Sequence, residues 1–191
     1  MKEKERKSIK NASEGCFDRM NKERKICMKE VTEKGDPKEE ILVNRLKQRG
    51  WHIAFAESCT GGLCAARLIN VPSASYVINE SIVTYANAAK VKYLNVPEEL
   101  IEKYGVVSEP VASAMAAGMA RAAKAEISAA TSGIAGPSGG SEEKPVGMVC
   151  FGFYISGELF TETRQFGDIG RNEVRKASVD FVFDTLLKLT E

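Results

Sequence analysis

The stretch FAESCTGGLCAARL, residues 55–68, runs from a short apolar segment through a serine, a cysteine, a threonine and two glycines into a segment with helical spacing. It predicts a strand followed by a helix across a tight turn. In open α/β sheets, ligands bind beyond the carboxyl ends of strands. A helix beginning at Gly61 or Gly62 would present free backbone N–H groups, so a phosphate or an oxyanion is expected beside Ser58 and Thr60. The alternative is a tight turn that simply requires small residues.

Strand-like and helix-like segments alternate along the rest of the chain. Strands are expected over 51–56, 80–86, 126–136, 146–155 and 158–166, the last two joined as a hairpin. Helices are expected over 37–49, 62–70, 88–94, 97–104, 108–124 and 170–189. This order predicts the α/β class: a three-layer α/β/α sandwich with a mixed, mostly parallel sheet containing one antiparallel hairpin.

The composition is that of one globular domain, with 191 residues, 43% of them apolar and 28% charged. Residues 1–36 are expected to be a charged extension, flexible or partly helical, and residues 37–191 a single domain. The net charge of +1 predicts no nucleic-acid partner. No apolar run is long enough to cross a bilayer, and the N-terminus lacks the apolar core of a secretory signal. We therefore expect a cytoplasmic protein with no membrane partner.

The single histidine and the five cysteines restrict the available chemistry. The cysteines show no metal-ligand spacing, so no metal site is expected. A Ser-His-Asp triad would depend on His52, whose place in a predicted strand favours a structural role. A serine nucleophile would then need a lysine, and Lys90 is the candidate because the start of a helix at Asn87 would lower its pKa; a surface lysine is the alternative. Cys59, beside Ser58, is a second candidate nucleophile, but it has no histidine to activate it.

A second glycine-rich loop, TSGIAGPSGG (131–140), follows a predicted strand. Neither glycine loop matches the P-loop or the dinucleotide-binding pattern. Arg171 and Arg175 are four residues apart and therefore share a helical face, where they would hold an anion. Ordinary surface pairing with Asp168 or Glu173 is the alternative.

One further motif is set aside. Ser141-Glu142-Glu143-Lys144 matches the S-x-x-K pattern of penicillin-binding enzymes, which requires the start of a helix. Here glycines precede it and Pro145 follows it, so the segment is predicted to be a loop. The partner motifs S-D-N and K-T-G are also missing from the sequence.

Together these segments resemble the CinA C-terminal domain family, the nicotinamide-nucleotide amidohydrolases. The matching segments occur in family order: AESCTGG (56–62), VTYANAAK (83–90), LNV (94–96), YGVVSEPV (104–111), SGIAGPSGGSEEKPVG (132–147) and R-x-x-x-R (171–175). The resemblance implies hydrolysis of the carboxamide of nicotinamide mononucleotide to nicotinate mononucleotide and ammonia, without a metal or other cofactor. It also implies a stand-alone member of the family that assembles as a homo-oligomer.

The resemblance also implies site residues. The family's catalytic serine, lysine and tyrosine map onto Ser58, Lys90 and Tyr85. Contacts to the oxyanion or the substrate are expected from Glu57, Thr60, Gly61, Gly62, Thr131, Ser132, Gly133, Gly136, Gly139, Gly140, Arg171 and Arg175. The family usually reads G-D-R or G-N-R before the last helix, whereas GDIGR (167–171) has extra residues, so which arginine binds the phosphate stays open. Two other functions also stay open: a catalytically inactive nucleotide-binding regulatory module, and a Ser-Lys amidase acting on a non-nucleotide amide.

Overall fold

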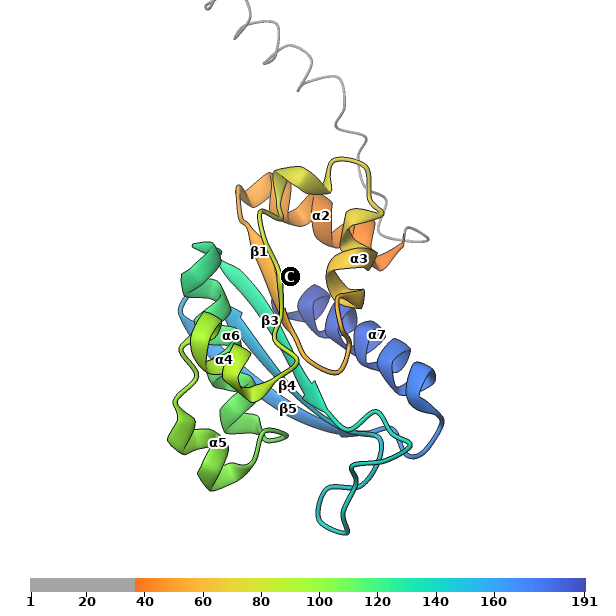
Figure 1. Cartoon of the computed structure of the whole chain (residues 1–191). Helices are drawn as coiled ribbons and strands as arrows, with labels where there is room; N and C mark the ends of the chain where they lie inside the picture. The colour runs from red at the N-terminus through yellow and green to blue at the C-terminus, as the bar shows by residue number, and fades with distance from the viewer. Residues whose placement is uncertain (1–36) are drawn as a thin grey trace, which may run out of the picture. The chain divides into compact units, whose positions relative to one another are not determined.

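The computed structural model describes residues 37–191, and the expected N-terminal extension, residues 1–36, lies outside the described residues. The described chain forms a five-stranded sheet in the order β2-β1-β3-β4-β5 (Figure 1). Its strands are β1 (Ile53–Glu57), β2 (Ile82–Val83), β3 (Ile127–Gly133), β4 (Met148–Ile155) and β5 (Glu158–Gln165). β1 pairs in parallel with β2 and β3, whereas β4 pairs antiparallel with β3 and β5. Only β4 runs against the other strands, so the sheet is mixed and mostly parallel, as predicted.

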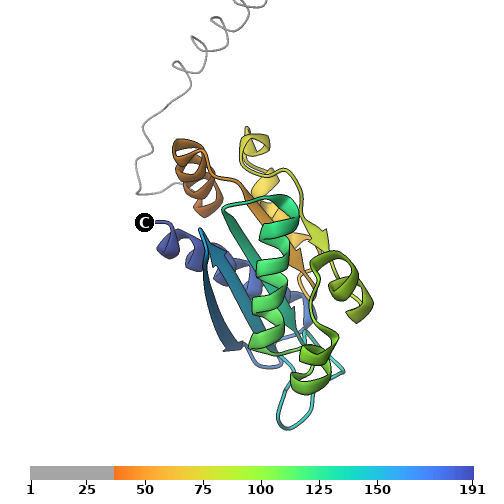
Figure 2. The same ribbon diagram turned by 90° about the vertical axis from the view of Figure 1, so that its left-hand side faces the viewer.

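Helices cover both faces of the sheet, which confirms the three-layer prediction (Figure 2). One layer contains α2 (Lys38–Arg49), α3 (Leu63–Ile69) and α7 (Arg171–Leu189). The other contains α4 (Asn87–Leu94), α5 (Glu98–Tyr104) and α6 (Glu109–Ala123). A short 3-10 helix, η1 (Ala74–Tyr76), lies between α3 and β2 in the chain.

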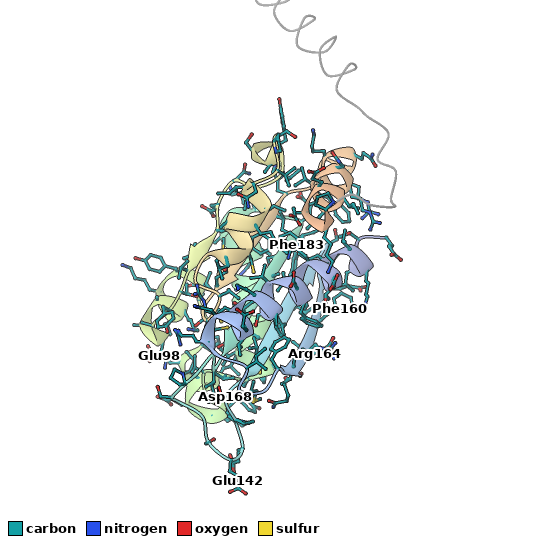
Figure 3. All side chains as sticks on the ribbon, turned by 90° about the vertical axis from the view of Figure 1, so that its right-hand side faces the viewer. Glu98, Glu142, Phe160, Arg164, Asp168 and Phe183 are labelled. Carbon is teal, nitrogen blue, oxygen red and sulfur yellow. The ribbon has the colours of Figure 1, made fainter. Side chains whose placement is uncertain are left out.

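Each face of β1 contributes to a different core. Ile53 and Phe55 belong to the cluster under α2, α3 and α7, which also holds Phe183 (Figure 3). Ala54 and Ala56 belong to the cluster under α6. This alternation follows from the two-residue period of a strand, and the small side chains on the α6 side allow that helix to approach closely.

Glycines mark the closest approaches of α6. A Cβ at Gly152 of β4 would lie 2.2 Å from the carbonyl oxygen of Ala112. A Cβ at Gly118 would lie 2.0 Å from the carbonyl oxygen of Leu94, the last residue of α4. Only glycine fits at both places, so α6 packs directly on the sheet while α4 packs directly on α6.

The strand expected over 126–136 ends earlier, at Gly133, and two further elements differ from the sequence prediction. The strand expected over 80–86 is only Ile82–Val83, because the chain leaves the sheet after the Thr84 N–H donates to the Glu57 carbonyl (2.8 Å). The helix expected from Gly62 starts at Leu63, since Gly62 has a φ of 96°, outside the helical range. Both differences lie beside the candidate site.

Candidate active site

The candidate site lies where β1 and β3 end side by side. Ser58 directly follows β1, and its N–H donates to the carbonyl of Thr131 on β3 (3.1 Å). Because the two strands are parallel, their carboxyl ends meet at one edge of the sheet, where α/β proteins bind ligands. Pairing with β3 therefore fixes the position of the turn at Ser58, in addition to the small residues of the turn itself.

Lys90 contacts Ser58 from the other helix layer. Its Nζ lies 3.2 Å from Ser58 Oγ, and it donates to the carbonyls of Thr84 (2.8 Å) and Tyr85 (3.3 Å). The Lys90 side chain is fully buried. No carboxylate within residues 37–191 lies within ion-pair distance of it. The surface-lysine alternative is therefore wrong.

This environment favours the neutral form of Lys90. Burial lowers the pKa of Lys90 from its ordinary value of 10.5, although nearby Cys59 opposes that shift. A neutral amine has two N–H groups and one lone pair. As an ammonium, Lys90 donates to Ser58 Oγ and to both carbonyls; in the neutral form the Thr84 and Tyr85 carbonyls would take the two N–H groups and leave the lone pair for the Ser58 hydroxyl. This arrangement would let Ser58 Oγ lose its proton to Lys90.

Two competing residues are poorly placed for that chemistry. Cys59 lines the same cavity, but burial raises the pKa of its thiol to about 11, so the reactive thiolate is disfavoured. His52 precedes β1, and its N–H donates to the carboxylate of Glu126 (2.7 Å). The length of β1 separates His52 from Ser58 by about 20 Å.

The start of α3 does not offer its N–H groups to a ligand, contrary to the expectation from the sequence. The buried Glu57 carboxylate accepts from the backbone N–H groups of Gly62 (2.9 Å), Cys64 (3.1 Å) and Ala65 (3.0 Å). An internal carboxylate therefore already occupies the position expected for a phosphate. Glu57 caps α3 and holds the turn, and it does not line the cavity.

Arg175 holds the same turn from its other side. Its guanidinium donates to the carbonyls of Cys59 (3.1 Å) and Thr60 (2.9 Å). Glu57 and Arg175 thus bind N–H and carbonyl groups of one turn, which we call the Ser58 turn (residues 58–62). Within the described chain, the N–H groups of residues 59–61 donate to no oxygen atom, and of these three residues only Cys59 lines the cavity.

Arg171 and Arg175 make different contacts. Arg171 lines the cavity, where it donates to the Gly136 carbonyl (2.9 Å) and to the Tyr85 hydroxyl (3.0 Å). Arg175 does not line the cavity. The Tyr85 hydroxyl contacts Arg171, whereas the Tyr85 backbone carbonyl contacts Lys90. Arg171 is therefore the arginine that a bound substrate would meet.

The cavity has a volume of about 200 Å³. Of the residues expected from the sequence, it brings together Ser58, Tyr85, Lys90, Ser132, Gly133 and Arg171. The expected residues that do not line it are Glu57, Thr60, Gly61, Gly62, Thr131, Gly136, Gly139, Gly140 and Arg175. Thr60 and Thr131 are buried and bind each other through their hydroxyls (2.8 Å), so they support the floor of the site from inside the protein.

Four lining residues were not assigned from the sequence: Asn87, Val106, Val107 and Ala135. Asn87 opens α4 three residues before Lys90, so its position next to a candidate base was an available signal. Val106 and Val107 follow Gly105, which separates α5 from α6. In the sequence, the glycine between these two helices was the one local signal that residues 106 and 107 could approach the site.

Two further features concern metal binding and membrane insertion of the described chain. Residues 37–191 contain no group of three or more His, Cys, Asp or Glu side chains that would bind a metal ion. In the same range, no helix is both long and apolar enough to span a membrane.

The fold and the contact between Ser58 and Lys90 define an α/β protein with a candidate serine–lysine site at the carboxyl edge of its sheet. Residues 36–190 match the profile of the CinA C-terminal domain, and the chain belongs to this family. The membership of this family predicted from the sequence is confirmed.

Relatives and solved structures agree with this membership. A CinA-like protein of Dictyoglomus turgidum is 49% identical over 72% of this chain but only 33% of its own length. A CinA-like protein of Kosmotoga olearia is 46% identical over 76% of this chain and 35% of its own length. The chain thus spans about a third of the length of these curated relatives.

Solved structures cover the fold more completely. The competence/damage inducible protein CihA from Agrobacterium tumefaciens is 37% identical, with a TM-score of 0.75 over 82% of this chain and 98% of that one. A CinA superfamily protein from Escherichia coli is 34% identical, with a TM-score of 0.77 over 80% of this chain and 88% of that one. These neighbours support the α/β architecture over about four fifths of this chain.

Proposed function

We propose that this protein hydrolyses the carboxamide of nicotinamide mononucleotide, giving nicotinate mononucleotide and ammonia. The observation that carries the proposal is the buried Lys90, whose Nζ lies 3.2 Å from Ser58 Oγ and has no carboxylate partner within residues 37–191. A buried lysine with a lowered pKa beside a serine is an arrangement suited to nucleophilic catalysis.

The reaction would proceed in two halves. In the first, Lys90 takes the proton of Ser58 as Oγ attacks the carboxamide carbon. The oxyanion is held by backbone N–H groups of the Ser58 turn. The C–N bond then breaks, and Lys90 returns its proton to the leaving nitrogen, which departs as ammonia. In the second half, Lys90 takes a proton from water, the resulting hydroxide attacks the acyl-enzyme, and the proton returns to Ser58 Oγ.

The remainder of the substrate would be recognised by the rest of the cavity. Val106, Val107 and Ala135 supply apolar surface for the pyridine ring. Arg171 is the cation available for the phosphate, and its present contacts with Tyr85 and Gly136 would be exchanged for contacts with the nucleotide. Tyr85 would hold Lys90 in place through its carbonyl, and its hydroxyl would hold Arg171 until the nucleotide binds.

The test is ammonia release from nicotinamide mononucleotide by the purified full chain, with a chelator present throughout. We expect activity in the parent and a loss of at least about 1,000-fold in Ser58→Ala and in Lys90→Ala. Lys92→Ala is the matched control, because Lys92 is an exposed lysine on the same helix. Its activity should equal that of the parent.

The other outcomes identify the competing functions. Tight binding of the nucleotide without ammonia release would instead support a regulatory binding module. Equal activity on amides that lack the nucleotide would support a broader Ser-Lys amidase. Loss of activity in Cys59→Ala but not in Ser58→Ala would assign the nucleophile to the thiol.

A further inference from the structure

The loop between β3 and β4 carries a lysine that the proposed chemistry does not use. This loop, residues 134–147, extends past the carboxyl edge of the sheet, with Glu142 near its tip (Figure 3). Within it, the Ser141 N–H donates to the Lys144 carbonyl (2.9 Å), and the Lys144 N–H donates to Ser141 Oγ (3.1 Å). This reciprocal pair closes a tight turn that fixes the backbone of Lys144.

The side chain of Lys144 reaches a distant part of the chain. Its ammonium donates to the carbonyl of Tyr104 (2.6 Å), at the end of α5, and to the carbonyl of Val107 (2.8 Å). Within residues 37–191, no carboxylate lies within ion-pair distance of Lys144. The charge of Lys144 is therefore directed at backbone carbonyls, and a charged donor makes such bonds stronger than a neutral one would.

The backbone beneath the ammonium is shaped to receive it. A Cβ at Gly105 would lie 2.8 Å from Lys144 Nζ, so a larger residue would push the ammonium away. Gly105 also has a φ of 75°, which favours glycine for a second reason. The chain thus leaves α5 in a conformation that presents the carbonyls on either side of Gly105 to one cation.

The segment that Lys144 binds is a wall of the cavity. Val106 and Val107 both line it. Val106 is held separately, since its carbonyl accepts from Ser132 Oγ (2.7 Å), and the Gly105 carbonyl accepts from Ser108 Oγ (2.8 Å). Lys144 is the one charged side chain in this set of contacts, and its hydrogen bonds tie the wall to the protruding loop, which also reaches the Val107 cluster through Ile134.

We propose that Lys144 is a positioning residue that fixes the Val106–Val107 wall and thereby sets how well the cavity fits its substrate. The inference rests on the proposed function for the identity of the substrate, but the restraint on the wall does not. Lys144 touches neither Ser58 nor Lys90, so it is expected to act on substrate binding and not on the bond-breaking step.

The test compares Lys144→Met with Lys103→Met in the full chain. Lys103 is an exposed lysine on α5, next to Tyr104, so the control makes the same chemical change beside the same wall. For Lys144→Met we expect the KM for nicotinamide mononucleotide to rise by about tenfold while kcat changes less than about threefold. The Gly105 amide, which donates to the Ile101 carbonyl (2.9 Å), should also exchange with solvent at least about tenfold faster, with no change in β1. Lys103→Met should match the parent in both measurements.

Two results would overturn the proposal: unchanged exchange of the Gly105 amide in Lys144→Met, or a fall in kcat with KM unaltered. If the parent releases no ammonia, the proposed function fails, and the affinity for nicotinamide mononucleotide by calorimetry takes the place of KM. Equal affinity of parent and Lys144→Met would then refute the positioning role. If Lys144→Met does not fold, Lys144→Gln, which keeps a donor for one carbonyl, is measured in its place.

Discussion

Lys90 differs from an ordinary lysine in both burial and partners. A protonated amine inside a protein is normally paired with a carboxylate, because removing a charge from water is costly. Here three oxygen atoms of Ser58, Thr84 and Tyr85 surround Nζ, and none of them carries a formal charge. The protein therefore holds a lysine whose charged form is disfavoured, a condition that reduces stability but suits the proton transfer we propose.

This environment predicts how stability depends on pH. The pKa of Lys90 is lower in the folded state than its ordinary 10.5. Below the folded pKa, both the folded and unfolded states bind the proton, so the cost of burying the charge is fully present. Between the folded pKa and 10.5, the unfolded state binds more protons, so stability due to Lys90 rises with pH.

The measurement is the free energy of urea unfolding of the parent and of Lys90→Met from pH 7 to pH 10.5. We expect the parent to gain stability relative to the variant as the pH rises, with a slope of at most about 1.4 kcal/mol per pH unit. Lys92→Met serves as the control and should follow the parent. Parallel curves for the parent and Lys90→Met would contradict the shifted pKa.

At the scale of elements, the Ser58 turn is held by two charged side chains of opposite sign. Glu57 at the end of β1 binds the N–H groups that open α3, and Arg175 from α7 binds the carbonyls of the turn. Groups of the turn that a ligand would otherwise contact are thus already used. This is why Arg175 and Glu57 support the Ser58 turn while Arg171 lines the cavity.

The different positions of Arg171 and Arg175 give a kinetic prediction. Arg171→Ala should raise the KM for nicotinamide mononucleotide by about tenfold or more, with a much smaller effect on the unphosphorylated riboside. Arg175→Ala should lower kcat for both substrates by a similar factor, because it loosens the turn that carries Ser58. Steady-state kinetics with the two substrates measures both effects.

The matched control is Lys176→Ala, which removes an exposed cation from the same helix. It should leave both kinetic parameters near those of the parent. A selective rise in the KM for the phosphorylated substrate in Arg175→Ala would reverse the assignment of the two arginines.

At the scale of the whole molecule, the site depends on how α4, α6 and the sheet stack. Ser58 follows the sheet, whereas Lys90 lies on α4, and α4 reaches its position by packing on α6. The contact between α4 and α6 passes through Gly118, where no side chain would fit. The 3.2 Å separation of Ser58 Oγ and Lys90 Nζ therefore depends on how closely α4 packs on α6.

Gly118→Ala tests this dependence. In a helix that is free of close contacts, glycine to alanine stabilises by about 0.5–1 kcal/mol. At Gly118 the added Cβ would meet the Leu94 carbonyl at 2.0 Å, so we expect a loss of about 1–3 kcal/mol from overpacking. Since α4 must move, ammonia release should also fall by at least about tenfold. Chemical denaturation and the ammonia assay measure the two effects.

The control for this variant is Ala122→Gly on the exposed face of α6. It should cost up to about 1 kcal/mol through helix propensity and leave activity unchanged. A stabilised Gly118→Ala protein would show that α4 and α6 tolerate separation, contrary to the packing described here.

Much of the local structure was predictable because periodicity and glycine positions are local properties. The strand before Ser58, the hairpin across Ser156–Gly157 and the alanine-rich helix α6 all lie close to where the sequence places them. The prediction of a strand over 80–86 was wrong outside Ile82–Val83, because backbone groups after Val83 bind residues elsewhere in the fold. The Thr84 and Tyr85 carbonyls bind Lys90, which is not a feature of strand propensity.

The sequence alone determined the α/β order of elements and the family. It also indicated that a serine nucleophile would need a lysine as its base, because the single histidine lies in a predicted strand. These follow from patterns read within short windows and from composition. Only the tertiary structure decided that Glu57 and Arg175 hold the turn, that Arg171 meets the cavity, and that Val106 and Val107 form its wall. The reason is physical: a polar side chain takes whichever partner the packing brings within hydrogen-bond distance, and these partners come from elements far apart in the chain.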